Sequence, residues 1–176
     1  MPEKSLEKII DLDPVMIIPS HKDPLDNTFF INEGIRKILG ATKHVHDETI
    51  KGMNSGKTVE ALMREIRLPP ELSITQEHGK VSWAVKSIWE YYSTWFHFDR
   101  TTELYAVPQS DIYNDLLGII DELKMQKLIQ NYIDRGDFLK ALHLIEIVLF
   151  ERNYRGPVLN FENFVLKELL KQANDT

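Results

Sequence analysis

Residues 81–96, with the sequence VSWAVKSIWEYYSTWF, form the most aromatic part of this chain. Their apolar side chains recur at the i, i+3, i+4 and i+7 spacing that gives an α-helix one apolar face. That face contains Val81, Ala84, Val85, Ile88, Trp89, Tyr92, Trp95 and Phe96. The spacing predicts a helix over residues 81–96 and, with the helices on either side of it, a mainly α-helical protein.

The same helix carries more aromatic surface than one neighbouring helix can cover. Trp83 and Tyr91 fall outside the apolar face, and the three tryptophans Trp83, Trp89 and Trp95 are six residues apart, which is about 240° around a helix. Core packing explains most such stripes, but here we expect core packing together with a contact to another subunit. The predicted interface residues are Trp83, Trp89, Tyr91, Tyr92 and Trp95.

Upstream, a helical apolar pattern over residues 29–53 predicts a long helix, in which Gly34 and Gly40 are unfavourable unless a neighbour packs closely there. Thr58 is expected to cap a second helix, which ends before the two prolines at 69 and 70. Gly-Lys-Thr at 56–58 resembles part of a phosphate-binding loop. That motif needs a preceding strand and a glycine where this chain has Lys51, so no nucleotide site is predicted.

Downstream, residues 97–108 are expected to form a loop, and Ser110 to cap a helix that reaches about residue 123. From residue 127 the pattern is a helix, a Gly136-Asp137 turn and a second helix, which resembles a tetratricopeptide-type hairpin. Asn160 is expected to cap a last helix. A tetratricopeptide-like adaptor that captures a peptide is therefore one possible function, although only about one and a half such units are present.

The N-terminal segment is predicted to hold a short helix capped by Ser5 and a buried strand over residues 15–18, followed by Pro19 and His21. A histidine just beyond a strand end is a common place for a metal ligand. The alternative is an ordinary loop histidine at the edge of a helical domain. His44 and His46 cannot grip one metal in the manner of an i, i+4 pair, and surface or packing roles are expected for them.

Composition narrows the choice of function class. The chain has 176 residues, 43% of them hydrophobic, a net charge of −6 and no cysteine, which excludes disulfides and thiolate metal sites. No basic stripe interleaved with aromatics points to nucleic acid. No apolar run approaches the ~20 residues of a membrane span, and the N-terminus shows no secretion signal, so a cytoplasmic location is the default expectation.

Several short motifs follow one another along the chain in an order that resembles a known family. They are Pro19-Ser20-His21, His46-Asp47-Glu48-Thr49, Met53-Asn54-Ser55-Gly56-Lys57-Thr58, Leu68-Pro69-Pro70-Glu71-Leu72 and residues 78–89, HGKVSWAVKSIW. The series resembles the alkyl sulfatases of the metallo-β-lactamase superfamily, from the end of the catalytic domain through the helical dimerisation domain. That family hydrolyses sulfate esters with two zinc ions held by a His-x-His-x-Asp-His motif and further ligands.

The resemblance implies specific expectations for this chain. Residues 1–26 would be a remnant of the last helix-strand unit of the metallo-β-lactamase-type fold, and residues 27–176 an alkyl sulfatase dimerisation-type domain. His21 is similar to the family's final histidine ligand, although Lys22 stands where a glycine is usual, and the main zinc motif is absent. We therefore assign no catalytic residue and no cofactor to the isolated chain, and expect zinc at His21 only if a partner chain completes the site.

Two functions follow from this resemblance. The first is homodimerisation, or association with a metallo-β-lactamase-type catalytic chain. The second makes this chain one subunit of a split zinc-dependent alkyl sulfatase. Because the resemblance covers an interaction domain, whether the chain takes part in catalysis stays open at this point.

Overall fold

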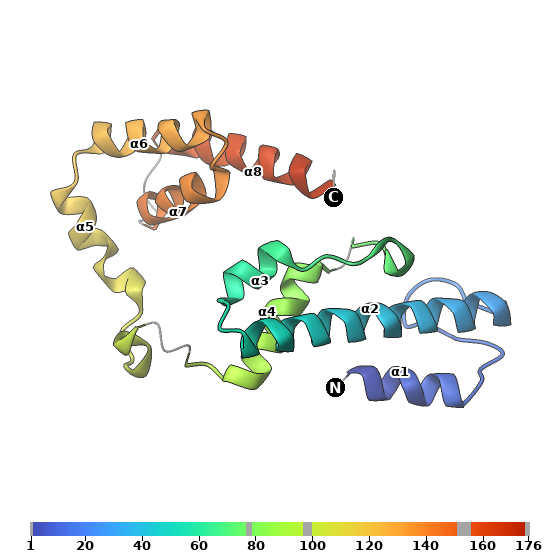
Figure 1. The fold of residues 1–176 in the computed structure, drawn as a ribbon. Coiled ribbons are helices and arrows are strands. Elements are labelled where there is room, and N and C mark those ends of the chain that lie inside the picture. The colour runs from blue at the N-terminus through green and yellow to red at the C-terminus, as the bar shows by residue number, and fades with distance from the viewer. Residues whose placement is uncertain (1, 77–78, 97–99, 151–155, 175–176) are drawn as a thin grey trace. The chain divides into compact units, whose positions relative to one another are not determined.

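The computed structural model describes residues 2–76, 79–96, 100–150 and 156–174, and it confirms that the protein is mainly helical (Figure 1). The chain divides into two compact units, residues 1–100 and residues 101–176. The predicted boundary between residues 26 and 27 concerns the origin of the two segments, and it stays a prediction.

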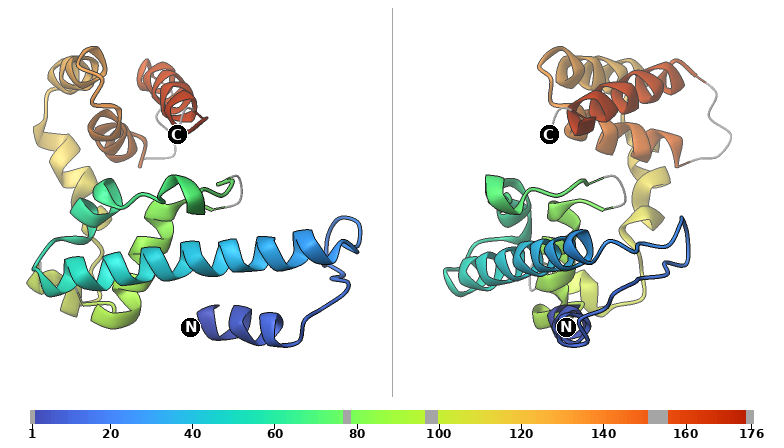
Figure 2. Two further views of the ribbon diagram at one scale, coloured as in Figure 1. Left: turned by 45° about the vertical axis from the view of Figure 1, so that its right-hand side comes forward. Right: turned by 90° about the vertical axis from the view of Figure 1, so that its right-hand side faces the viewer.

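The first unit is built around one long helix. It contains α1 (Pro2–Asp11), α2 (Thr28–Asn54), α3 (Val59–Glu65), the 3-10 turn η1 (Pro70–Leu72) and α4 (Val81–Ser93). The short α1 lies along α2, and α4 packs against both α2 and α3 (Figures 1 and 2). Their shared core consists of Val45, Leu62, Ile66 and Val85, with Trp89 among the partly buried side chains packed against it.

Local sequence explains where these helices begin. Asn27 caps α2, because its side chain accepts a hydrogen bond from the backbone N–H of Phe30, and Thr58 caps α3 as predicted by accepting from Ala61. The Gly-Lys-Thr segment follows the helix α2. A phosphate-binding loop would instead follow a strand, so the structure agrees with the prediction that no such loop is present here. Gly40 faces the side chain of Leu72, so close packing accounts for that glycine, whereas Gly34 faces open space.

The N-terminal segment differs from the prediction in two ways. Ser5 lies inside α1, since the helix begins at Pro2 and proline suits a first helical turn. The predicted strand at residues 15–18 is reduced to one antiparallel bridge between Ile17 and Leu25, and Val15 and Ile18 are exposed rather than buried. A single bridge offers no second layer to pack against, which explains the exposure.

The second unit contains η2 (Thr101–Leu104), η3 (Gln109–Ile112), α5 (Tyr113–Ile119), α6 (Glu122–Asp134), α7 (Phe138–Leu149) and α8 (Val158–Asn174). The last three helices pack on one another (Figure 2). Their core consists of Met125, Ile129, Ile133, Ala141, Ile145, Val148, Val158 and Val165. The small Ala141, fully buried, allows the close approach of α6 and α7.

The turn between α6 and α7 has the predicted glycine. Gly136 has φ +73°, its N–H donates to Ile133 O at 2.9 Å, and the N–H of Asp137 donates to Tyr132 O at 2.9 Å. These two bonds are those of a Schellman motif, which satisfies the last carbonyls of a helix. The helical hairpin is thus present, while its kinship with tetratricopeptide repeats stays a prediction.

Several predicted boundaries in this half are wrong. Residues 101–104, expected as loop, form η2, and the helix expected after Ser110 is split, because the chain is extended at Ile120 and Asp121 caps a new helix by accepting from Lys124 N at 2.9 Å. Asn160 lies inside α8, which starts after Pro157. In the first unit, α4 ends at Ser93 rather than residue 96, since Thr94 takes φ +64°.

Candidate functional site

The helix α4 distributes its aromatic side chains between the core and the surface. Trp89 packs against the core cluster of the first unit. Trp83, Tyr91 and Trp95 are 60%, 67% and 66% exposed, although Trp95 follows the end of the helix. We call these three exposed rings the aromatic surface. On an ideal helix Trp83 and Tyr91 lie about 80° apart, so they belong to one side of α4, with the small Ser87 between them and Ala84 next to Tyr91.

Tyr92 is held in place by a neighbouring helix. Its hydroxyl lies 2.9 Å from Nε2 of His46 on α2, and Nδ1 of the same imidazole lies 3.0 Å from Oδ1 of Asp47. The ring of Tyr91 meets that of Tyr92 edge-on, with centroids 5.1 Å apart. His46 therefore positions the base of the aromatic surface. The sequence predicted only a surface or packing role for His46, because its partner Tyr92 lies 46 positions away.

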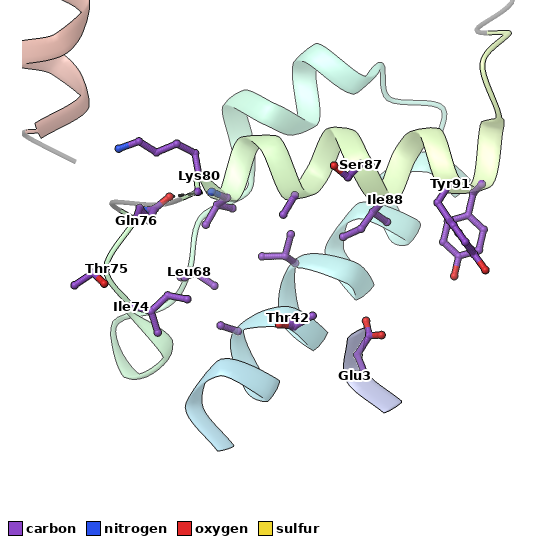
Figure 3. A pocket seen from close by; sticks show the side chains of 16 residues that line it. Glu3, Thr42, Leu68, Ile74, Thr75, Gln76, Lys80, Ser87, Ile88 and Tyr91 are labelled. Carbon is purple, nitrogen blue, oxygen red and sulfur yellow. Dashed lines mark hydrogen bonds between the residues drawn. The ribbon is translucent and has the colours of Figure 1, made fainter. Parts of the chain in front are cut away.

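An apolar groove lies beside Tyr91 within the first unit, with a volume of about 680 Å³. It is bounded by α2, α4 and the segment before α4, and Thr42 from α2 and Ile88 from α4 face it (Figure 3). Glu3 of α1 lies toward the end near Tyr91 (Figure 3). At the other end the side-chain oxygen of Gln76 accepts a hydrogen bond from the N–H of Val81 at 2.9 Å, which fixes the start of α4. The sequence pattern did not reveal this groove, because its walls come from separate segments.

His21 lies in the exposed turn between Ile17 and Leu25. Across the described ranges of the chain, no three His, Cys, Asp or Glu side chains gather to hold a metal ion. A zinc ion is normally held by three or four protein ligands, so the residues around His21 do not form a zinc site by themselves.

The other histidines have ordinary partners. The Nε2 atom of His44 lies 3.0 Å from the carbonyl oxygen of Arg67, and Nδ1 of His143 lies 3.8 Å from a carboxylate oxygen of Glu146. His78 and His97 lie outside the described residues. None of the helices in the part of the chain that the structure describes has both the length and the apolar character needed to cross a membrane.

These features define a helical domain with exposed aromatic side chains and without a metal cluster among its described residues. The sequence profile of the alkyl sulfatase dimerisation family matches residues 58–174. The chain therefore belongs to that family, as the resemblance predicted.

The relatives are sulfatases much longer than this chain. A linear primary-alkylsulfatase of Pseudomonas sp. is 26% identical over 121 residues, which is 66% of this chain and 23% of the relative. An alkyl/aryl-sulfatase of Saccharomyces cerevisiae, BDS1, is 28% identical over 85 residues, or 46% of this chain and 13% of that protein. The chain thus spans about a quarter or less of the curated relatives it matches.

A solved structure shares the fold. It is the stereoselective inverting sec-alkylsulfatase Pisa1 from Pseudomonas sp., with a TM-score of 0.74 and 18% sequence identity over 95% of this chain and 27% of the other. The helical fold is therefore shared with about a quarter of that structure.

Proposed function

We propose that this chain is a dimerisation domain that binds a second copy of itself. The observation that carries this proposal is the aromatic surface of Trp83, Tyr91 and Trp95, three large rings left exposed on or next to one well-formed helix. Aromatic residues are enriched at protein interfaces, and a group of exposed large apolar side chains is typical of a binding surface. The family assignment supports the same function.

Burial of these rings provides enough free energy for a modest dimer. Complete burial of one such side chain is worth roughly 1.5–3 kcal/mol, and more than half of each ring is still exposed. A two-fold contact counts every ring twice. The groove beside Tyr91 offers space for an apolar side chain of the partner. Because association itself costs several kcal/mol, we expect a dissociation constant in the micromolar range or below.

Sedimentation of the full chain tests the proposal. At tens of micromolar, the wild type should show twice the chain mass, and Trp83→Ser with Tyr91→Ser should weaken the dimer by at least about tenfold without loss of helicity. Lys86→Ser is the control, since it changes an exposed residue of the same helix that is not part of the aromatic surface. A wild type that stays monomeric at high concentration would refute homodimerisation.

A second candidate function is association with a catalytic chain. It is favoured by the exposure of His21 and by the length of the relatives, which are about four times longer than the matched region or more. A separate metallo-β-lactamase-type chain would then supply the His-x-His-x-Asp-His ligands, and His21 would complete its zinc site.

Co-purification with such a chain tests this candidate. Zinc content and sulfatase activity should rise on mixing, and His21→Ala should remove both while the two chains still bind each other. Failure of every candidate hydrolase chain to bind would count against it.

A further inference from the structure

The outer face of α8 carries an unpartnered stripe with a coiled-coil spacing. Leu159, Asn163, Leu166 and Leu170 follow each other at steps of four, three and four residues. Leu159, Leu166 and Leu170 are 37%, 46% and 63% exposed, and Asn163 is exposed as well. We call these four residues the leucine stripe. A different side of α8, more than about 100° around the helix from the stripe, buries Val158 and Val165 against the core of the second unit, so the stripe is not the face that holds α8 in that unit.

Steps of four and three are those of the d and a positions of a heptad repeat. Leu159 and Leu166 take d positions, and Asn163 and Leu170 take a positions. Residues with this spacing pack against a second helix whose axis is nearly aligned with that of the first. An outer face with this spacing is matched by a copy of itself, because each a and d layer is then filled by identical side chains.

Asn163 discriminates between the possible pairings. In a parallel pair in register, each Asn163 faces its own copy, and the two side-chain amides can donate to and accept from each other. A shifted register would place Asn163 against leucine and leave its amide without a hydrogen bond. A single asparagine at an a position is a known device for fixing the register of two-stranded coiled coils.

The charges beside the stripe select the parallel direction. Glu162 occupies a g position and Lys167 the e position five residues later. In a parallel pair, the g residue of one helix meets that e residue of the other, so two Glu162–Lys167 pairs would form across the axis. An antiparallel pair would set g beside g and e beside e, which brings no opposite charges together here.

From these observations we infer that α8 pairs with α8 of a second copy, parallel and in register, on the two-fold axis of a homodimer. The inference rests on the proposed dimerisation and assigns it a contact within the second unit, which is tested separately from the aromatic surface of the first unit. The stripe covers only about two heptads, too few for a coiled coil formed from free peptides. Because α6 and α7 already hold α8 in the second unit, the pairing needs no folding of the helix.

Engineered cysteines test the geometry directly, because the chain contains none of its own. Under mild oxidation, Leu166→Cys should link two chains, since identical d residues of a parallel pair approach to disulfide distance. Lys171→Cys is the control, an exposed position on the same helix that lies outside the stripe and should not link. If Leu166→Cys fails to link although the wild type sediments as a dimer, the α8 pairing is wrong and the proposed dimerisation stands.

A charge exchange provides an independent test. Glu162→Lys and Lys167→Glu should each weaken the dimer several-fold, and the double variant should restore it, because the exchanged charges again meet across the axis. Five residues apart, the two side chains do not face each other on one helix, so the exchange has no matching effect within a monomer. A double variant as weak as the singles would overturn the inference.

The rate at which a thiol reagent labels the cysteine of Leu166→Cys distinguishes the other ways in which the leucine stripe could be covered. In a monomeric protein, a slowly labelled Leu166→Cys would mean that another part of the same chain covers the stripe. A monomeric wild type with a freely labelled cysteine would mean that the stripe needs a different partner. Either result overturns the α8 pairing, and both contradict the proposed homodimer.

Discussion

The hydroxyl of Tyr92 lies 2.9 Å from Nε2 of His46, and this hydrogen bond joins α4 to α2 at the base of the aromatic surface. The side chain of His46 is only 21% exposed. If its hydrogen bond to Tyr92 is lost, water therefore has little access to take the place of the hydroxyl. The pair therefore contributes both to the stability of the first unit and to the position of Tyr91, whose ring packs on Tyr92.

We expect Tyr92→Phe to lower the free energy of unfolding by about 1 kcal/mol, the usual value for one hydrogen bond between side chains. Urea unfolding followed by circular dichroism measures the change. Tyr91→Phe is the matched control, a neighbouring and more exposed tyrosine whose loss of hydroxyl should change little. Equal changes in the free energy of unfolding for the two variants would show that the hydrogen bond to His46 does not stabilise the protein.

Two glycines of α2 should respond to alanine in opposite ways. A Cβ at Gly52 would overlap the side chain of Leu62, which is 2% exposed and held in the core, whereas Gly34 has open space around it. Gly52→Ala should therefore destabilise the protein by about 1–3 kcal/mol through overpacking. Gly34→Ala should stabilise it by about 0.5–1 kcal/mol, since alanine favours a helix interior. Thermal unfolding of both variants measures these changes in stability. A stabilising Gly52→Ala would contradict the close packing of Leu62 against Gly52.

The sequence predicted the helices whose signals are local. The cap at Thr58 and the glycine turn at Gly136 depend on neighbouring residues only, and both are confirmed. The buried strand at residues 15–18 was wrong because an apolar run indicates burial only where a second layer exists to cover it. Val15 and Ile18 lack that layer in this structure.

In the candidate site too, the sequence predicted what depends on local helix geometry and missed what depends on the packing of separate helices. Periodicity singled out Trp83 and Tyr91 as residues off the core face of their helix, and the structure leaves them exposed. It also placed Trp89 on the apolar face, and that ring packs against the core cluster. It could not show that His46 meets Tyr92, because this contact depends on how α2 and α4 cross. The roles of these residues in association stay predictions.

An ion pair fastens α1 to α2 and should make this contact sensitive to alkaline pH. Nζ of Lys43 lies 2.6 Å from Oε1 of Glu7, and this hydrogen bond, followed by the attraction of the same carboxylate, raises the pKa of Lys43 above its usual value. A raised lysine pKa stabilises the folded state at neutral pH, and that contribution is lost as the pH rises through the folded-state pKa, above roughly pH 10.5.

Hydrogen exchange of the α1 amides measures the contact. We expect Lys43→Met to accelerate exchange in α1 at pH 7 and to have little further effect at strongly alkaline pH. Lys51→Met is the control, because Lys51 pairs with Glu48 inside α2 and does not reach α1. Identical exchange in the wild type and Lys43→Met would show that apolar contacts alone hold α1.

The turn of the second unit should depend on Gly136. Its φ of +73° is strained for any residue with a Cβ, so Gly136→Ala should cost about 1 kcal/mol of stability. Gly118→Ala is the control, a substitution with open space near the end of α5 and without a positive φ. Chemical unfolding of the two variants gives the comparison, and equal stabilities would contradict the described turn.

The last prediction concerns zinc. His21 is exposed, and no group of three metal-ligating side chains exists in the described ranges, so the isolated chain offers a zinc ion a single histidine at this position. Activation of water by zinc needs an ion fixed by several protein ligands. We therefore expect the purified chain with added zinc to show no hydrolysis of alkyl sulfates, and His21→Ala to leave its zinc affinity, measured by calorimetry, unchanged. His143→Ala serves as the control for weak binding by an exposed histidine. Turnover by the pure chain that disappears in His21→Ala, but persists in His143→Ala, would show that the chain holds a catalytic metal centre of its own.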